Sequence, residues 1–262
     1  MILAKDGIHS YEKIREDTYR IDEKGIANTY LLLGKDKALL IDSGLGVGDL
    51  YQTIRELTEL PIVLALTHRH CDHAGGRNYF KEYYVNENDK PLIYKILSSQ
   101  FASKKLLSMN KENKNPVKFN KQPNHAKPVF IKDGYSFDLG GRIVKTINTP
   151  GHTKGSIVFL DEKTKLMFTG DDVNLWLWLQ LPGCTNLSTW LIGAKKILGL
   201  AEEYTPYCGH NEGLITKEGI RELIRVGEEL LVNKTTNKAK TFNYPEDEKA
   251  PARICITKSR LK

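Results

Sequence analysis

Short apolar runs alternate with amphipathic stretches along the first part of the chain. Three segments have the pattern of consecutive β-strands, at residues 16–21, 27–33 and 37–42. Apolar residues then recur at the spacing of an amphipathic helix, which predicts a helix over 46–60 that Pro61 ends. The next run, 62–66, is continuously apolar, as expected of a strand buried on both faces. The first part is therefore expected to place strands before a helix and to end on a buried strand.

The second part of the chain repeats this plan. Five further strands are expected, at residues 128–131, 135–138, 142–148, 155–160 and 165–169. They are followed by a helix over 187–200, a short strand over 204–208 and a helix over 217–232. Two last segments, 238–244 and 252–257, have the pattern of closing strands. The shared plan indicates an α/β (α+β) protein in which two sheets pack face to face with helices outside.

The size of the chain agrees with one large domain. Its 262 residues, 40% of them hydrophobic, are enough for a single large core, so we expect one domain over residues 1–262. Within it, residues 88–127 begin with a helical pattern and then become rich in lysine, asparagine and proline. We consider this segment a candidate lid over a functional site.

The positive charge of the chain has a simple structural explanation. The net charge is +7, and residues 104–127 hold seven lysines against one acid, Glu112. A solvated surface is the commoner reason for such a run than a nucleic-acid site. Few aromatic residues lie among these lysines, so a stacking platform for bases is not indicated. We expect no nucleic-acid partner.

The sequence predicts a soluble cytoplasmic protein without a membrane partner. The N-terminus has no apolar core of a secretory signal, and no apolar run has the length that crosses a bilayer. The four cysteines are scattered and form no CxxC pair: Cys71, Cys184, Cys208 and Cys255. Such a pattern is typical of a reducing compartment. No pattern in the sequence specifies an oligomeric state.

The segment from Thr67 to His73 carries most of the chemistry. It holds His68, His70, Asp72 and His73, although the whole chain has seven histidines. Alternate positions of an extended segment point the same way, so His68, His70 and Asp72 are expected to converge, with His73 following at a turn. Imidazole and carboxylate groups suit zinc best, with iron or manganese as alternatives. A His-rich polar loop without function is a poor explanation of this clustering.

Further ligand-type side chains follow expected strands downstream, each beside a glycine. They are His152 in Thr149-Pro150-Gly151-His152, the pair Asp171 and Asp172 after Gly170, and His210 after Gly209. A single such histidine or aspartate is usually structural, as a satisfied core group or a cap. Together with the first cluster they place five of the seven histidines at strand ends, which favours a metal centre.

The order of these motifs resembles that of the metallo-β-lactamase-fold hydrolase superfamily. The motifs are Thr-His-x-His-x-Asp-His, Thr-Pro-Gly-His-Thr, Thr-Gly-Asp and Gly-His, and the segment from Ile41 to Gly44 resembles that family's early Asp-x-Gly element. They extend over residues 41–213. The resemblance implies a four-layer αββα sandwich with the site at the edge of the two sheets, in agreement with the strand pattern.

The resemblance also implies a set of ligands. His68, His70 and His152 would hold one metal, Asp72, His73 and His210 the other, and a bridging aspartate would join them. The family pattern selects Asp171, directly after Gly170, as the bridge, and leaves Asp172 to cap or orient the loop. Asp42 would hydrogen-bond a ligand histidine and fix its tautomer. A turn aspartate beside Gly44 is the alternative for Asp42.

The implied activity is hydrolysis by two zinc ions, alternatively iron or manganese, that share a bridging hydroxide. Asp72 and Asp171 are the candidate catalytic residues, and Asp72 can also orient the nucleophile or accept its proton. The form of the Pro-Gly-His-Thr turn looks most similar to thioesterases of the glyoxalase II type and to lactonases. The expected partner is a small carbonyl substrate: a thioester, a lactone or a related ester or amide.

Two other functions remain open at this stage. Persulfide dioxygenases, which are mononuclear iron oxidoreductases, resemble the same family and keep its His-x-His-x-Asp-His motif. A phosphodiesterase or ribonuclease branch would suit the positive charge, but the Pro-Gly-His-Thr turn favours small molecules. The metal content of the protein separates hydrolysis by two zincs from oxidation by one iron.

Three smaller expectations concern side chains near the ligands. Cys71 and Cys208 each lie beside a ligand, but their positions indicate packing and not metal binding. Trp176 and Trp178 lie two residues apart in an apolar run that follows Asp171, so they can share one face at the mouth of a substrate pocket. Packing of this run into the core is the equal alternative.

Overall fold

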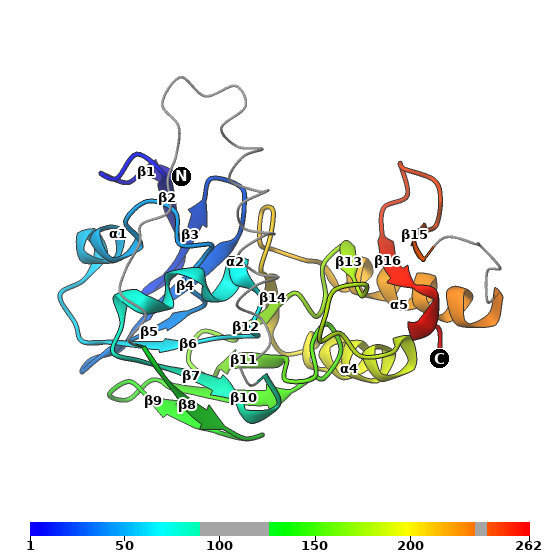
Figure 1. Cartoon of the computed structure of the whole chain (residues 1–262). Helices are drawn as coiled ribbons and strands as arrows, with labels where there is room; N and C mark the ends of the chain where they lie inside the picture. The colour runs from blue at the N-terminus through cyan, green and yellow to red at the C-terminus, as the bar shows by residue number, and fades with distance from the viewer. Residues whose placement is uncertain (90–125, 234–239) are drawn as a thin grey trace.

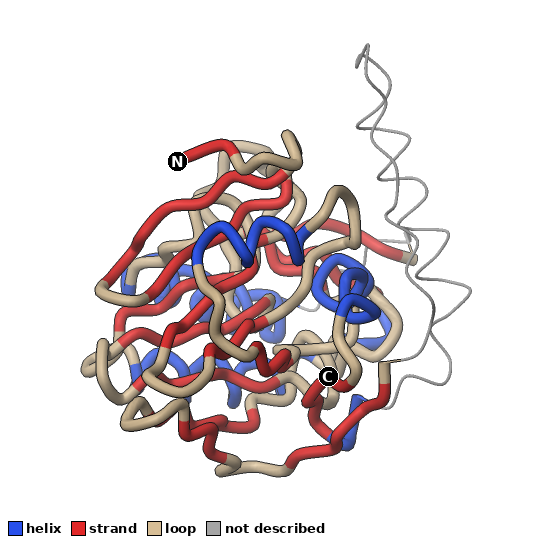
Figure 2. The backbone as a smooth tube through the Cα atoms, turned by 90° about the vertical axis from the view of Figure 1, so that its left-hand side faces the viewer, coloured by secondary structure: helices blue, strands red, loops and turns tan. Residues whose placement is uncertain are grey.

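In the computed structural model, an eight-stranded sheet forms the first half of the protein; the structure describes residues 1–89, 126–233 and 240–262. The strands follow one another in chain order: β1 (Ile2–Leu3), β2 (His9–Arg15), β3 (Thr18–Glu23), β4 (Asn28–Leu33), β5 (Ala38–Ile41), β6 (Ile62–Ala65), β7 (Glu82–Asn86) and β8 (Lys127–Ile131). β1 to β5 are antiparallel, whereas β5 to β8 run parallel. In Figure 2 the chain starts at an edge of this array, as the strand order requires.

A five-stranded sheet forms the second half. Its order is β14-β12-β11-β10-β9, from β9 (Ser136–Asp138), β10 (Ile143–Asn148), β11 (Ile157–Asp161), β12 (Leu166–Gly170) and β14 (Thr205–Cys208). β9 to β12 are antiparallel neighbours, and β14 joins β12 in parallel. Consequently β10, β12 and β14 run in one direction and end at the same edge of the sheet.

Alternating side chains separate the layers. Leu39 and Ile41 of β5 pack between the sheets against residues such as Phe159 of β11. Leu40 of β5 faces the other way, into a cluster that includes Leu50 and Ile54 of helix α1 (Leu50–Leu57). This period of two gives each sheet one face toward its partner and one toward helices. The fold is the expected αββα sandwich.

The outer face of the second sheet packs against two long helices. Val158 and Leu160 of β11 join a cluster with Trp190 of α4 (Leu187–Leu200) and Leu223 of α5 (Lys217–Asn233). Figure 1 shows α4 and α5 at the same end of the molecule as a third, small sheet. This sheet has the order β13-β16-β15, from β13 (Trp176–Trp178), β15 (Thr241–Tyr244) and β16 (Arg253–Thr257).

Several elements differ from the sequence expectations. The helix expected over 46–60 is limited to α1. Gly46 and Gly48 lie outside it, because their φ values are positive, at 86° and 69°. Asp49 caps the start of the helix, since its carboxylate accepts from the backbone N–H of Gln52. The two closing strands pair with each other, and β16 also pairs with β13, so they form the small sheet and do not extend either main sheet. β1, β2, β7 and β13 were not expected from the sequence, and β2 is rich in charged residues that obscure the strand pattern.

The candidate lid at 88–127 lies largely outside the described residues. Only its ends are described: a 3-10 turn at Glu87–Asp89 and the start of β8 at Lys127. In the part of the chain that the structure describes, no helix has both the length and the apolar character needed to cross a membrane.

A buried arginine connects the two main sheets. Arg142, 2% exposed, lies just before β10 and donates through Nε and Nη2 to the carboxylate of Asp161 at 3.2 and 2.6 Å. Its remaining N–H groups donate to residues of the first half of the chain. Nη1 donates to the carbonyls of Asp17 and Leu33 at 2.7 and 2.9 Å, and Nη2 donates to the hydroxyl of Thr18 at 2.6 Å. All five N–H groups of the guanidinium therefore have acceptors.

We expect Arg142→Ala to lower the free energy of unfolding by about 3–5 kcal/mol, because it leaves the Asp161 carboxylate buried without its charged partner. Urea unfolding followed by circular dichroism measures this change. The matched control is Arg225→Ala on α5, which removes an exposed arginine paired with Glu222 and Glu229 and is expected to cost less than about 1 kcal/mol. Equal losses in the two variants would contradict a role for Arg142 in joining the sheets.

Candidate metal centre

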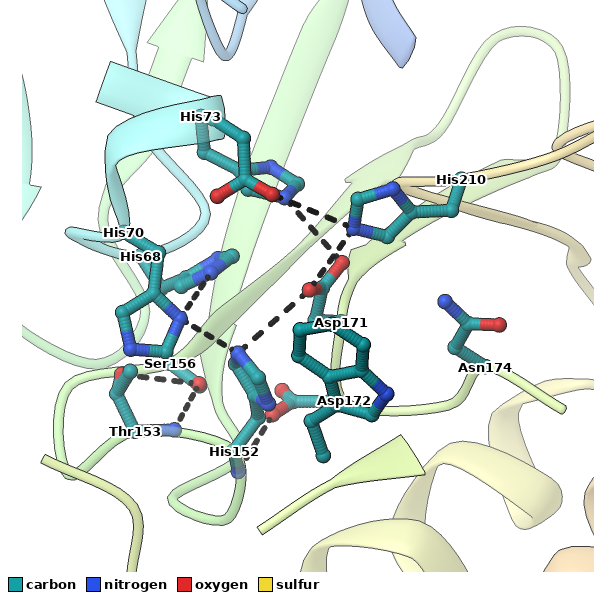
Figure 3. A network of polar contacts seen from close by, with 12 residues as sticks. His68, His70, His73, His152, Thr153, Ser156, Asp171, Asp172, Asn174 and His210 are labelled. Carbon is teal, nitrogen blue, oxygen red and sulfur yellow. Dashed lines mark hydrogen bonds and ion pairs between the residues drawn. The ribbon is translucent and has the colours of Figure 1, made fainter. Parts of the chain in front are cut away.

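Ligand-type side chains gather where strands of the two sheets end. His68, His70, Asp72 and His73 follow β6 of the first sheet. From the second sheet, His152 follows β10, Asp171 directly follows β12, and His210 follows β14. Figure 3 shows these rings and the Asp171 carboxylate turned toward one another. The parallel direction of β10, β12 and β14 brings their ends to one edge, which explains how distant segments meet.

Six of the seven expected ligands fall into two groups of three, and Asp171 forms a third group with one histidine from each, His68 and His73. His68, His70 and His152 make up the three-histidine group, and Asp72, His73 and His210 make up the Asp72 group; within each, one nitrogen or oxygen per residue lies within 4.8 Å of the others. Asp171 lies between them. Its Oδ2 is 3.5 Å from His152 Nε2 and 3.1 Å from His210 Nε2, and its Oδ1 is 3.3 Å from His73 Nε2.

One part of the sequence reasoning was wrong. Alternation along an extended segment was expected to turn Asp72 to the same side as His68 and His70. Instead the short helix α2 (Cys71–Ala74) begins directly after His70, whose backbone is still extended at φ −62° and ψ 154°. The helix ends the alternation. It turns Asp72 toward His73 and His210, the grouping that the resemblance implies.

The outward nitrogens of four rings meet oxygen atoms. These pairs are His68 Nδ1 with Thr67 Oγ1 at 3.0 Å, His70 Nε2 with Pro182 O at 3.3 Å, His73 Nδ1 with Asp42 Oδ2 at 2.8 Å, and His210 Nδ1 with Ile26 O at 2.7 Å. A neutral imidazole has one N–H, and a carbonyl or carboxylate oxygen accepts it. In the neutral form of these rings the N–H therefore points outward, and the other nitrogen presents a lone pair to the centre.

These inward lone pairs fit a divalent cation. His68 Nε2 and His70 Nδ1 lie 3.1 Å apart, and His152 Nε2 lies 2.7 Å from His70 Nδ1. Two facing lone pairs repel each other unless a cation lies between them. Burial lowers the pKa of all three rings, that of His152 to about 3, and so favours the neutral form that binds metals.

The Asp72 group and the neighbouring Asp171 carboxylate also fit a divalent cation. His73 Nε2 and Asp171 Oδ1 are buried and have no hydrogen-bond partner. Burial disfavours a charged His73 ring, but the carboxylates of Asp171 and Asp42 outweigh this effect and raise its pKa. Likewise, burial opposes ionisation of Asp171, yet the rings of His210 and His73 hold its pKa well below the usual range. A divalent cation supplies the positive charge that this carboxylate demands.

Asp42 orients a ligand ring from behind. Its carboxylate accepts from the backbone N–H of Thr67 at 2.7 Å, from Thr67 Oγ1 at 2.8 Å and from His73 Nδ1 at 2.8 Å. The residue is buried and has a positive φ of 65°. It is thus both the turn residue and the orienting group, so the two sequence interpretations hold together.

Asp172 points away from the histidines. Its Oδ2 accepts from Thr149 Oγ1 at 2.5 Å, its Oδ1 from the backbone N–H of His152 at 3.3 Å, and its carbonyl from Trp190 Nε1 at 2.7 Å. Burial raises the pKa of its carboxyl to about 7. Asp172 therefore holds the turn that carries His152, while Asp171 faces the centre.

Neither neighbouring cysteine belongs to a ligand group among the described residues. Cys71 packs against the apolar cluster around Leu45 and Val47, and burial raises the pKa of its thiol to about 12. Cys208 donates through its thiol to the carbonyl of His210 at 3.4 Å, and burial raises its pKa to about 11. Both thiols favour the neutral form, as expected of packing residues.

The tryptophan segment has two faces. Trp176 is 48% exposed, and its ring lies edge-on to that of Trp178 with centroids 6.2 Å apart. Leu177 and Leu179, between and beyond them, are fully buried in the core. Packing into the core therefore applies to Leu177 and Leu179, whereas Trp176 is exposed. The guanidinium of Arg253, which the sequence did not single out, lies 4.9 Å over the Trp176 ring.

Sequence reasoning missed the backbone groups of the centre. The carbonyls of Ile26 and Pro182 have no side-chain signature, and no pattern points to them. Gly209 did have a signal, as the glycine before a ligand histidine. A Cβ atom on Gly209 would lie 2.5 Å from His73 Cε1 and 2.7 Å from Asp171 Oδ1, so the ligands close directly over its backbone.

The sandwich and its metal-binding edge define a class of metal-dependent hydrolase. Residues 22–174 match the family model of the metallo-beta-lactamase superfamily. The chain belongs to this superfamily and is a hydrolase with a centre for divalent metal. The family matched is the one that the motifs resemble.

Curated relatives agree with this class. Acyl-coenzyme A thioesterase MBLAC2 of Gallus gallus is 28% identical over 207 residues, which cover 70% of this chain and 72% of that protein. The human protein of the same name is 29% identical over 211 residues, with the same shares. Atrochrysone carboxyl ACP thioesterase nsrC of Aspergillus novofumigatus is 29% identical over 174 residues, covering 65% of this chain and 44% of that protein.

Solved structures agree on the fold. A metallo-beta-lactamase family protein of Thermus thermophilus superposes with a TM-score of 0.59 at 18% identity, covering 85% of this chain and 83% of that one. An archaeal superfamily protein of Sulfolobus tokodaii gives 0.55 at 19% identity, with 82% and 84% covered.

We expect Gly209→Ala to weaken metal binding by about 10- to 100-fold, because the new methyl group displaces His73 and Asp171. Metal retained after dialysis against a chelator measures the loss. Gly199→Ala, at a helical position where a Cβ meets nothing within 4 Å, is the matched control and is expected to retain metal like the unchanged protein. If both variants retain metal equally, the close approach at Gly209 does not constrain the ligands.

Proposed function

We propose that this protein is a dinuclear zinc-dependent hydrolase of thioesters. The observation that supports it is the pair of three-residue groups with Asp171 between them. In this proposal the three-histidine group holds one zinc, the Asp72 group holds the other, and the carboxylate of Asp171 bridges them. Iron or manganese can occupy the same donor set, since imidazole and carboxylate bind all three.

The thioester is chosen from the small carbonyl substrates because the curated relatives carry that activity in their names. Chemistry supports the choice. A thiolate is a good leaving group near neutral pH, since ordinary thiols have a pKa of about 8.5. Hydrolysis of a thioester therefore depends less on a strong general acid than hydrolysis of an amide does. A lactone remains the closest alternative substrate for the same site.

When bound, the zinc ions polarise the carbonyl oxygen of the substrate and acidify a water molecule near neutral pH. Water adds to the carbonyl carbon, the carbon–sulfur bond breaks, and a carboxylate, a thiol and one proton result. We propose that Asp72 accepts and relays the proton that the water loses, because its carboxylate is held less closely by the rings: its Oδ2 lies 3.9 Å from His210 Nε2. The carboxylate of Asp171 lies within 3.5 Å of nitrogens of three rings and serves as the bridge.

The substrate is proposed to lie against Trp176 and Trp178. The segment that carries them starts close after Asp171, and it returns to the centre at Pro182, whose carbonyl meets His70. Both ends of the segment therefore lie at the metal centre, and its outward face is aromatic. This face suits the apolar part of an acyl or thiol group.

A mononuclear iron oxidoreductase needs only one of the two groups. The presence of a second complete group, with Asp72, His73 and His210, favours the dinuclear hydrolase.

Metal analysis of the purified protein, followed by a panel of thioester, lactone, β-lactam and phosphodiester substrates, tests the proposal. Two zincs per chain and preferred thioester turnover are expected; one iron with thiol-dependent oxygen uptake would replace the proposal by the oxidoreductase.

Asp171→Ala is expected to lower bound zinc below one equivalent and to reduce thioester turnover by at least about 1000-fold, because both groups lose their shared carboxylate. Elemental analysis and a thiol-release assay measure the two effects. Asp247→Ala removes an exposed aspartate outside the centre and serves as control. Full activity of Asp171→Ala would exclude the bridging role.

Trp176→Ala is expected to raise KM for long-chain acyl thioesters by about tenfold and to leave kcat nearly unchanged, since it removes apolar contact and no metal ligand. Steady-state kinetics over a series of acyl lengths measures this. Tyr51→Ala on α1 is the matched control, because Tyr51 is also an exposed aromatic with an arginine 4.9 Å over its ring. Unchanged KM at every chain length would remove Trp176 from the substrate surface.

A further inference from the structure

The loop of residues Leu181–Thr185, called here the 181–185 loop, contacts His70 and the turn that carries His152, two members of the three-histidine group. The Pro182 carbonyl lies 3.3 Å from His70 Nε2. The same loop bonds to the turn that carries His152: the N–H and the hydroxyl of Thr185 both donate to the Gly151 carbonyl, at 3.0 and 2.9 Å. The Gly183 carbonyl accepts from the N–H of Lys154 at 3.0 Å. The loop therefore sets the positions of both rings relative to each other.

An arginine near the C-terminus holds the two ends of this loop. Arg260 ends the 3-10 turn η4 (Lys258–Arg260), directly after β16. Its Nη2 donates to the Leu181 carbonyl at 3.0 Å and its Nη1 to the Thr185 carbonyl at 3.2 Å. One planar guanidinium thus spans the loop, with Pro182 between the two acceptors. A lysine offers a single ammonium and cannot reproduce this fork.

The small sheet fixes the start of the same loop. The N–H of Leu179 donates to the Cys255 carbonyl of β16 at 2.7 Å, so the chain enters the loop from a strand edge. After the loop, the N–H of Ser188 donates to the Lys262 carbonyl at 2.8 Å. The C-terminal segment therefore contacts the chain before, within and after the 181–185 loop. It lies outside residues 22–174, the part that matches the family model.

The Asp72 group is oriented from a different direction. Asp42 bonds His73, and the carbonyl of Ile26 accepts from His210. Both acceptors belong to the first half of the chain. A change at Arg260 is therefore transmitted to His70 and His152, while the rings of His73 and His210 keep their acceptors.

We propose that Arg260 is a positioning residue for the three-histidine group: it clamps the 181–185 loop so that the Pro182 carbonyl accepts from His70 and the Gly151 turn holds His152. This inference rests on the proposed two-metal centre. Its consequence is selective: loss of the clamp weakens one metal position and spares the other.

The test is a titration of the metal-free full-length protein with Zn²⁺ in competition with a chromophoric chelator, and with Co²⁺ followed by visible absorption. Arg260→Ala is expected to weaken binding at one of the two positions on the order of tenfold and to alter the Co²⁺ spectrum of that position. Arg260→Lys keeps the positive charge but cannot donate to both carbonyls at once, so it is expected to show the same defect. It replaces the alanine variant if that variant fails to fold.

Three controls identify the position and the cause. His70→Ala and His210→Ala each remove a ligand from one group, and the defect of Arg260→Ala should match the spectrum lost in His70→Ala. Arg253→Ala removes an arginine of the neighbouring strand β16, one that stacks on Trp176, and should bind both metals normally. Thermal unfolding of the metal-free variants shows whether the fold is kept.

The outcomes separate the inference from the function proposed above. If His70→Ala and His210→Ala bind metal like the unchanged protein, the two-metal centre itself is wrong. If those variants each lose one position while Arg260→Ala and Arg260→Lys bind both metals normally, the positioning role is overturned. Equal weakening of both positions, together with a lower unfolding temperature, would also overturn it, because that result reflects general stability.

Discussion

The metal centre depends on the direction in which each imidazole ring carries its single N–H. A ring that turns this N–H inward cannot offer its lone pair to a cation, and an oxygen on the outer side of four of the five rings, those of His68, His70, His73 and His210, prevents this. The carboxylate of Asp42 and the carbonyl of Ile26 supply this oxygen for His73 and His210. Because these acceptors belong to the packed fold, they turn the remaining nitrogen of each ring toward the centre.

This requirement connects the centre to the whole fold. The acceptor Asp42 follows β5, Ile26 lies between β3 and β4, and Pro182 lies between β13 and α4. The ligands themselves come from both main sheets. A tautomer is therefore fixed only after the layers have packed, and the buried Arg142, which bonds to both sheets, contributes to that packing. Burial then has a second effect, because it keeps the three-histidine group neutral and able to bind metal.

Close backbone approach is the other condition for the centre. Gly75 and Gly76, which follow the segment from Thr67 to His73, leave no room for a side chain. A Cβ on Gly75 would lie 2.1 Å from the Leu45 carbonyl oxygen, and one on Gly76 would lie 2.4 Å from that of Ser43. The glycines let the ligand segment pack against the loop after Asp42. This contact keeps Asp42 within reach of His73.

Much of this could be predicted from the sequence, because ligand chemistry resides in side chains and strand periodicity is visible in residue types. The alternation of buried and exposed positions gave the two sheets and their helices. Asp72 was grouped wrongly by the residue pattern alone, since nothing in it marked the start of a four-residue helix after His70. Backbone carbonyls such as that of Pro182 carry no sequence signal. Arg260 could not be found for the same reason, because its partners are two carbonyls far away in the chain.

The distribution of the centre along the chain has a consequence for substrate binding. Six of the seven expected ligands lie within residues 22–174, while His210 and the acceptor Pro182 lie beyond them. The segment between Asp171 and Pro182 carries Trp176 on its outer face and ends at the acceptor of His70. The same short stretch of chain therefore carries the proposed substrate surface and the acceptor of His70. If the proposed substrate lies against Trp176, a shift of this stretch on binding would reach the ring of His70 through the Pro182 carbonyl.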